Sequence, residues 1–585
     1  MLRHGAGGGY SRGAGRRKRE SPASASGVAT EWHCGRPLFS PLVAKWAMDA
    51  PPLAFAFGSF MASPRRPSSA APRSGRSGVP RPRVEVNVQA APQLRVGSEV
   101  QVQGTETFEK GATTALVGPD RVRVMGLLPG EAGRARVTHV DARGVMARLT
   151  RVERPSADRV TPACPHYGVC GGCDLQHLSY PAQLAHKANV VRQALREAIP
   201  AGLLQVRDTI GAPEPWGQRT RIGVQVGGAI GDLKPCFFKS HSHDLVPITE
   251  CAVQDPLGTK MMFRIFEIAS VLRISPWREK EHKGVFRALL IRTAPGTERV
   301  HVVVIVARPD FPQRDAFVQA IMDAGADGVS LNIHRVPGHL LLGPETLMVA
   351  GHARLHAQVR GAEYVMSPGA FFQTSRFGLT TLIDQVRLAL EDLPNTARVL
   401  DLYCGVGLFT LSMAPRVSHV TGVEENRAAI TDARIAAKLR NVENVTFIAG
   451  SAEGQIKSLA KDRERRPDAV IIDPPREGCH PAVLRCVGDA LRPRRVVYVS
   501  CDPQSLGRDA ALLAASGYKL RWAQPLDMFP HVSHVETVAV FDRDTSALVP
   551  QRTSGQRRRD KEAPPVEIPF DARGGKGSRK LLRRR

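Results

Sequence analysis

Cys501 stands at the end of a short apolar run, Val496 to Val499, and is followed directly by Asp502-Pro503. The run reads as a buried strand that the Asp-Pro pair ends, so one thiol is expected at the strand's carboxyl end. Ligands of open α/β sheets bind outside these ends, which makes Cys501 a candidate nucleophile. The plain alternative is a small buried apolar residue, as most cysteines without a disulfide are.

A glycine-containing turn lies at Asp401-Leu-Tyr-Cys-Gly405-Val-Gly407, between an apolar strand and a helix. Glycines at this position let a backbone approach a ligand closely, but the third glycine of a dinucleotide motif is replaced by Thr410. Glu424 ends the next strand, where one carboxylate can accept hydrogen bonds from two ribose hydroxyls. Together these residues indicate an S-adenosylmethionine site.

A third strand ends at Asp473-Pro474-Pro475-Arg476 and is expected to face the same cleft. Amino-methyltransferases use a similar Pro-Pro turn followed by an aromatic residue, and Arg476 occupies that position here. The difference favours a carbon atom of a base as the target, because a thiol is available.

Glu536 is the candidate general base. Uracil C5 becomes nucleophilic only after a thiolate adds to C6, and a base must later remove the C5 proton. Cys501 would supply the thiolate, and Glu536 follows the segment Asp527-Met-Phe-Pro-His-Val-Ser-His-Val shortly before the last apolar run. By periodicity alone, Glu536 could equally be a solvated charge.

Three cysteines are spaced as Cys164-x5-Cys170-x2-Cys173 in a glycine-rich loop. A tetrahedral site needs a fourth thiolate, and Cys236 and Cys251 are both candidates. Such a set suits zinc or an iron-sulfur cluster, and it favours an intracellular metal site over a disulfide framework.

The elements that would position these residues fall into three groups. Short β-rich runs from 94 to 152 predict a small all-β barrel, and Leu127-Leu-Pro-Gly-Glu131 within it resembles the signature turn of a TRAM domain, an RNA-binding barrel. Strands dominate from 212 to 357, and two of them are expected to carry two arginines each. These arginines either form a face that meets phosphates or lie on a solvated strand face. Helices alternate with apolar strands from 365 to 545, which predicts a parallel doubly wound sheet.

The chain has 585 residues and a formal net charge of +26, concentrated at its ends. Residues 1–90 hold 14 Lys and Arg against 4 Asp and Glu, and residues 551–585 hold 12 against 4. Such tails suit a polyanionic partner, with plain solvated disorder as the alternative. No apolar run is long enough to span a membrane, and we expect a cytoplasmic monomer.

The motifs together resemble the RNA uracil-5-methyltransferase family, which shares Phe-Phe-Gln at 371–373, Asp-Leu-Tyr-Cys-Gly-Val-Gly, Ser-Cys-Asp-Pro and Phe-Pro-x-x-x-His-Val-Glu. The branch with both a TRAM domain and a [4Fe-4S] cluster acts on 23S ribosomal RNA. The resemblance implies Cys501 as nucleophile and Glu536 as base. It also implies two binding sets: Gln373, Tyr403, Glu424 and Asp473 for the methyl donor, and Cys164, Cys170, Cys173 and Cys251 for the cluster.

The predicted organisation has five parts: a basic extension at 1–93, a TRAM barrel at 94–155, a central iron-sulfur and RNA-binding domain at 156–360, a Rossmann-like methyltransferase domain at 361–545, and a basic tail at 546–585. The predicted function is S-adenosylmethionine-dependent methylation of a uridine in 23S rRNA. Alternatives are a tRNA or other RNA substrate, and a non-catalytic rRNA-binding factor. A cytosine-C5 enzyme would carry Pro-Cys where Pro474-Pro475 stands, and a radical enzyme would need Cys-x3-Cys-x2-Cys.

Overall fold

The computed structural model describes residues 94–544 apart from residues 143, 241, 337–340 and 463. The basic extension predicted at 1–93 and the tail predicted at 546–585 lie outside these residues. None of the described helices is long and apolar enough to cross a membrane.

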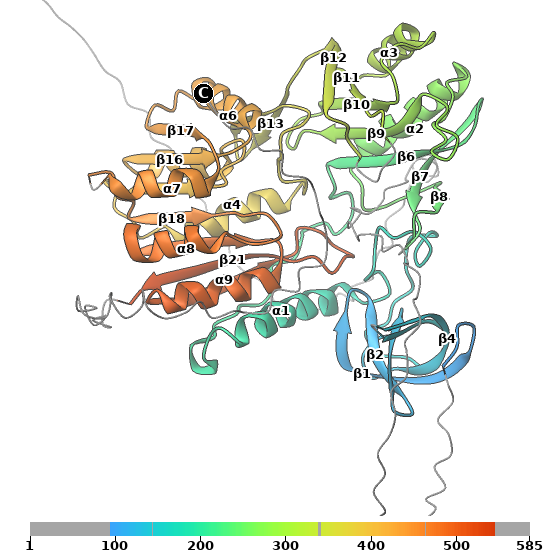
Figure 1. Ribbon diagram of the computed structural model, residues 1–585, viewed down its shortest axis with the longest axis horizontal. Coiled ribbons are helices and arrows are strands. Elements are labelled where there is room, and N and C mark those ends of the chain that lie inside the picture. Colours follow the sequence, from blue (N-terminus) through green and yellow to red (C-terminus); the bar gives the residue numbers. More distant parts are fainter. Residues whose placement is uncertain (1–93, 143, 241, 337–340, 463, 545–585) are drawn as a thin grey trace, which may run out of the picture. The chain divides into compact units, whose positions relative to one another are not determined.

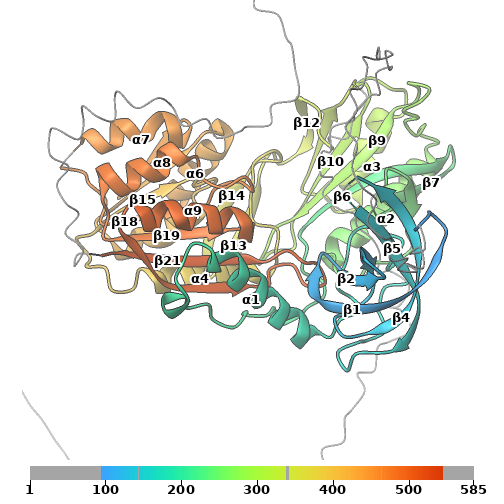
Figure 2. The same cartoon turned by 60° about the horizontal axis from the view of Figure 1, so that its bottom comes forward.

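The expected small β-barrel is present as five strands that close in the order β1-β2-β3-β5-β4 (Figure 2). Alternate residues point inward, and Val102, Val122 and Leu127 form its small apolar core. Glu131, fully buried at the Leu-Pro-Gly-Glu turn, accepts a hydrogen bond from the backbone N–H of Leu128 at 2.8 Å. The strands are β1 (Glu99–Glu109), β2 (Ala112–Val117), β3 (Asp120–Met125), β4 (Ala132–Asp141) and β5 (Gly144–Arg154).

The central part is a seven-stranded sheet in the order β12-β11-β10-β9-β6-β7-β8. Two helices, α2 (Pro256–Val271) and α3 (Arg314–Asp323), pack their apolar sides on one face of it. A separate hairpin, β13 (Leu355–Val359) with β14 (Ala362–Met366), follows it in the chain. The sheet strands are β6 (Arg221–Ala229), β7 (Asp232–Phe238), β8 (Leu245–Pro247), β9 (Phe286–Thr293), β10 (Val300–Val306), β11 (Gly328–Ile333) and β12 (Glu345–Gly351).

The last part contains the predicted doubly wound sheet, with strand order β17-β16-β15-β18-β19-β21-β20. The order reverses beside β15, which places a ligand crevice at the carboxyl ends of the central strands. Its strands are β15 (Arg398–Leu402), β16 (His419–Glu424), β17 (Val445–Ala449), β18 (Ala469–Ile472), β19 (Arg495–Ser500), β20 (Tyr518–Leu526) and β21 (Glu536–Arg543).

Helices cover both faces of this sheet, and Figure 1 shows α7, α8 and α9 stacked along one of them. The other face is covered by α4, α5 and α6. The bounds are α4 (Gly378–Ala389), α5 (Leu408–Met413), α6 (Arg427–Leu439), α7 (Ala452–Lys461), α8 (Pro481–Cys486) and α9 (Pro503–Ala515), with short turns at Ala201–Leu203, Ala414–Arg416 and Val487–Leu491.

Helix α1 (Tyr180–Arg196) lies far from the sheet in sequence but packs on the face that α9 covers. A Cβ atom on Gly507 of α9 would lie 2.3 Å from the carbonyl oxygen of Ala194, so only glycine permits this approach of the two helices. The segment that follows the cysteine loop is therefore attached to the doubly wound sheet.

One feature of the sheet differs from the fully parallel prediction. Strand β21 runs antiparallel to both of its neighbours, β19 and β20. A loop without a helix joins β20 to β21, and such a short connection produces antiparallel strands. The reversal brings the first residue of β21, Glu536, to the edge where the parallel strands end.

Candidate active site

Five of the six predicted catalytic and methyl-donor residues lie at the carboxyl edge of the doubly wound sheet. Tyr403 follows β15, Glu424 ends β16, Asp473 follows β18, Cys501 follows β19, and Glu536 begins β21. All five line one cleft of about 4440 Å³, and the buried Gln373 lines it too. The sequence thus predicted a set of residues that the fold brings together.

The glycine turn after β15 has the backbone shape that the sequence suggested. Gly405 and Gly407 have φ angles of 55° and 82°, in the left-handed region that favours glycine. A Cβ atom on Gly407 would also lie only 3.1 Å from the ring of Phe447. Asp401 is fully buried and accepts hydrogen bonds from the backbone N–H and hydroxyl of Thr410, at 2.8 and 2.6 Å, which fixes the turn to the start of α5.

Glu424 is held at the rim of the same turn. Its two carboxylate oxygens accept hydrogen bonds from the backbone N–H groups of Gly405, at 3.1 Å, and Asn426, at 2.8 Å. Each oxygen retains a lone pair that can accept a further hydrogen bond. The Tyr403 hydroxyl donates a hydrogen bond to Glu453 at 3.2 Å. Hydrogen bonds within the protein therefore hold the side chains of Glu424 and Tyr403 beside the turn.

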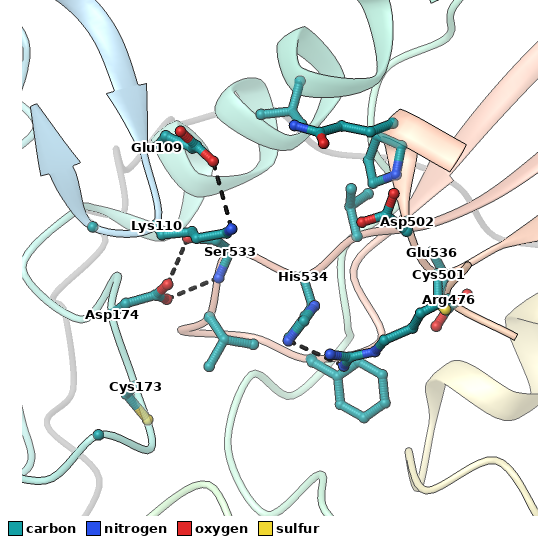
Figure 3. A pocket seen from close by; sticks show the side chains of 18 of the residues that line it. Glu109, Lys110, Cys173, Asp174, Arg476, Cys501, Asp502, Ser533, His534 and Glu536 are labelled. Atoms are coloured by element: carbon teal, nitrogen blue, oxygen red, sulfur yellow. Dashed lines mark hydrogen bonds and ion pairs between the residues drawn. The ribbon is translucent and has the colours of Figure 1, made fainter. Parts of the chain in front are cut away.

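Cys501 and Glu536 are neighbours because of strand register. Ser500 of β19 pairs with Thr537 of β21, so the next residues outward in this antiparallel pair are Cys501 and Glu536. Figure 3 shows both side chains in the same wall of the cleft. Glu536 is only 6% exposed, whereas Cys501 is half-buried and can meet a ligand.

Burial and charge shift the ionisation of both groups. Burial, and then the negative charges of Glu536 and Asp473, raise the pKa of the Cys501 thiol to about 12. Burial raises the pKa of Glu536 to about 7, and Arg476 opposes that shift. Burial and the charge of Glu536 also raise the pKa of Asp473 well above its ordinary value. A carboxyl that titrates near neutrality can both release and accept a proton, as a general base must.

Arg476 is the cation of this carboxylate cluster. It follows the Pro474-Pro475 turn, and Figure 3 shows its side chain reaching toward His534. The guanidinium Nη2 lies 3.3 Å from Nε2 of that histidine. Burial, and then Arg476, lower the pKa of His534 to about 4, so a neutral ring accepts this hydrogen bond. In the sequence, Arg476 argued only against an exocyclic amine as the target, because it stands where amino-methyltransferases have an aromatic residue.

The loop that carries Glu536 is fastened to α1, a contact that the sequence did not predict. The fully buried Lys187 donates to a carboxylate oxygen of Asp527 at 2.6 Å and to the carbonyl oxygen of Phe529 at 3.1 Å. Gln183 accepts a hydrogen bond from the backbone N–H of His531 at 3.0 Å. The partners are more than 300 residues apart in the chain, and no local pattern signals such pairing.

The four predicted metal-binding cysteines, Cys164, Cys170, Cys173 and Cys251, line one small pocket. Cys236, the other candidate, does not line it. Four thiols are the donor set of a [4Fe-4S] cluster, in which each thiolate binds a different iron. Within residues 94–544, as far as they are described, no three His, Cys, Asp or Glu side chains are grouped to ligate one metal ion. The cluster and its ligands stay a prediction.

The fold and the cleft define a class of protein. A doubly wound sheet with a glycine turn after β15 and an acidic residue at the end of β16 is the arrangement of S-adenosylmethionine-dependent methyltransferases. The family model for tRNA (uracil-5-)-methyltransferases matches residues 352–544.

Relatives match most of the chain. An uncharacterized RNA methyltransferase of Halalkalibacterium halodurans is 33% identical over 76% of this chain and 96% of its own length. An uncharacterized RNA methyltransferase of Enterococcus faecalis is 35% identical over 72% of this chain and 92% of its own length. The crystal structure of the Pyrococcus abyssi tRNA (uracil-54, C5)-methyltransferase in complex with S-adenosyl-L-homocysteine has a TM-score of 0.59 and 25% identity, over 75% of this chain and 99% of that one. The chain belongs to the RNA uracil-5-methyltransferase family and is an S-adenosylmethionine-dependent RNA methyltransferase.

Proposed function

We propose that this enzyme methylates C5 of a specific uridine in 23S rRNA, with Cys501 as nucleophile and Glu536 as base. The observation that carries the proposal is the strand register that places Cys501 beside Glu536 at the edge where the methyl donor is expected. Methylation of a carbon atom of uracil needs two groups. One is a thiol that can bond to the nucleobase, and the other is a carboxyl with a pKa near 7 that can take up a proton.

In the proposed reaction, the Cys501 thiol gives its proton to solvent in the cleft, the sulfur bonds to C6, and the electron pair of the C5–C6 double bond moves to form an enolate. C5 then takes the methyl group from the sulfonium, which leaves as S-adenosylhomocysteine. Glu536 removes the C5 proton, the double bond re-forms, and the thiolate is expelled. The target base must leave its stack to enter the cleft, at a cost of a few kcal/mol, which favours a loop.

Further roles are proposed for residues that line the cleft and the small cysteine pocket. Gln373, Tyr403, Glu424 and Asp473 are proposed to bind S-adenosylmethionine, with Glu424 accepting hydrogen bonds from the ribose. Cys164, Cys170, Cys173 and Cys251 are proposed to bind a [4Fe-4S] cluster. The barrel is proposed to be a TRAM domain that contacts the RNA backbone.

Mapping of 5-methyluridine in cells that lack the gene tests the substrate. We expect one 5-methyluridine to disappear from 23S rRNA and to return with the wild-type gene but not with Cys501→Ala. Transfer RNA is the second candidate, because the matching family model and the Pyrococcus abyssi structure are named for tRNA enzymes. Loss of the modification from tRNA alone would contradict the rRNA assignment, and return with Cys501→Ala would favour a non-catalytic factor.

A further inference from the structure

The four arginines at two strands of the central sheet are used differently. Arg221 begins β6, Arg287 and Arg292 lie on β9, and Arg219 precedes β6 by two residues. Arg287 donates to the carbonyl oxygen of His334 at 3.0 Å and lies over the ring of Trp277. Arg219 donates to the carbonyl oxygen of Gly172 in the cysteine loop at 3.2 Å. Arg221 and Arg292 differ from these two because each has a buried Nε atom without a hydrogen-bond partner among the described residues.

Arg221 and Arg292 lie opposite each other across the antiparallel pair β6·β9. Both line the cleft that also contains Cys501, whereas the next residue along β6, Ile222, points into the apolar core on the opposite face. Like charges directly opposite on one face of a sheet destabilise it, so this pairing has a cost in free energy.

Both guanidinium groups retain unused hydrogen-bonding capacity. Arg292 is only 8% exposed, and its Nη1 donates to the carbonyl oxygen of Ala370 at 2.6 Å. The Nε atoms of both Arg221 and Arg292 are buried without a hydrogen-bond partner among the described residues. An unpaired buried donor on a charged group is costly, and an anion that accepts from it recovers that cost.

The carboxylate that acts on Arg292, Asp432, is already engaged elsewhere. Asp432 accepts hydrogen bonds from Nε of Arg354 at 2.7 Å and from the backbone N–H of Ser367 at 2.6 Å. Burial, and then Arg221, lower the pKa of Arg292 to about 9, and Asp432 offsets this only in part. The pair therefore presents a net positive charge to the cleft.

We infer that Arg221 and Arg292 together bind one phosphodiester group of the RNA substrate. The inference rests on the proposed function for the identity of the RNA but not for the chemistry of the site. Two guanidinium groups suit the oxygens of a phosphate. Three of the four proposed methyl-donor residues, Tyr403, Glu424 and Asp473, lie at the edge of the other sheet. Since Arg292 also donates a hydrogen bond to the carbonyl oxygen of Ala370, it would connect a bound phosphate with the segment that leads into Gln373.

The test is the binding of a transcript of 23S rRNA to the full chain over a range of KCl concentrations. Arg221→Gln is expected to weaken binding about tenfold at moderate salt and to lower the slope of log affinity against log salt by about 0.7 to 1, the loss of one phosphate contact. Arg264→Gln is the matched control, because Arg264 is exposed on α2, which covers the opposite face of the sheet. It should behave as wild type.

The double variant Arg221→Gln/Arg292→Gln distinguishes one phosphate from two. If both residues hold one phosphate, the double variant loses no more slope than either single variant. Slope losses that add, an unchanged slope in Arg221→Gln, or an equal loss in Arg264→Gln would overturn the inference. So would weaker binding of S-adenosylmethionine with RNA binding unchanged. Methyl transfer by the wild type to the same transcript tests the proposed function separately, because backbone binding does not require the target uridine.

Discussion

Asp174, the residue after Cys173, accepts two hydrogen bonds from Ser533, one from its backbone N–H at 2.8 Å and one from its hydroxyl at 2.7 Å (Figure 3). The backbone N–H groups of Asp174 and Leu175 in turn donate to the carbonyl oxygen of His531, at 3.1 and 3.0 Å. Glu536 follows three residues after Ser533. The cysteine loop therefore contacts the segment that positions the proposed base.

Ser533→Ala tests this connection with a small change. The variant keeps the backbone hydrogen bond but leaves one oxygen of the half-buried Asp174 without its donor, at a cost of about 1–3 kcal/mol. We expect the protein-RNA adduct to form at the wild-type rate and to resolve more slowly, because the Glu536 loop is less well held. The measurement is a single-turnover time course on denaturing gels. Thr431→Ala, which removes an exposed hydroxyl from α6, is the control, and equal kinetics in all three proteins would disprove the connection.

The buried pair Lys187 and Asp527 should dominate the stability of the same loop. Removing one partner of a buried ion pair leaves an uncompensated charge, so Lys187→Met is expected to lower the free energy of unfolding by about 3–5 kcal/mol. Lys187→Met/Asp527→Leu should recover part of that loss. Denaturant unfolding measures both values, and a double variant no more stable than Lys187→Met would show that the charges do not interact.

The metal site can be tested by comparing two cysteines. Protein purified without oxygen should be brown and contain iron, and Cys251→Ser should abolish the colour because Cys251 lines the pocket with the other three proposed ligands. Cys236→Ser should keep the iron, since Cys236 lies outside that pocket. Stoichiometric zinc without iron, or loss of iron from the Cys236 variant alone, would contradict the proposed ligand set.

The ionisation of Glu536 predicts the pH dependence of adduct resolution. Burial raises the pKa of Glu536 to about 7, and only the deprotonated carboxylate can remove the C5 proton. The rate at which the protein-RNA adduct breaks down should therefore increase as the pH rises through 7, roughly tenfold between pH 6 and pH 8. Rates of adduct decay in a pH series check this. A rate that is flat over this range would exclude Glu536 as the titrating base.

The sequence predicted the parts of the site that lie at strand ends. Cys501, Glu424 and Asp473 each stand where an apolar run stops, and the edge of a parallel sheet gathers such residues. The direction of β21 was missed, although it brings Glu536 beside Cys501, because the apolar pattern of a buried strand is the same in either direction.

Contacts between distant segments could not be predicted for a different reason. The segments that contain Lys187 and Asp174 carry no pattern that predicts contact with the methyltransferase sheet. The residues to which these two side chains bind are more than 300 positions away in the chain. A buried lysine in an amphipathic helix gives the same sequence signal as an exposed one. The arginines at positions 219, 221, 287 and 292 were predicted to form a possible phosphate face, but only the structure separates Arg221 and Arg292 from Arg219 and Arg287.

The order of steps at Cys501 and Glu536 is the central claim, and trapping of the covalent adduct tests it most directly. Glu536→Gln and Cys501→Ala are incubated with S-adenosylmethionine and a 23S rRNA transcript, then run on denaturing gels. Blocking the last step traps an intermediate and blocking the first prevents it. We predict that Glu536→Gln accumulates a methylated protein-RNA adduct, while Cys501→Ala binds RNA without any adduct. Normal turnover by Glu536→Gln, or an adduct with Cys501→Ala, would contradict the account.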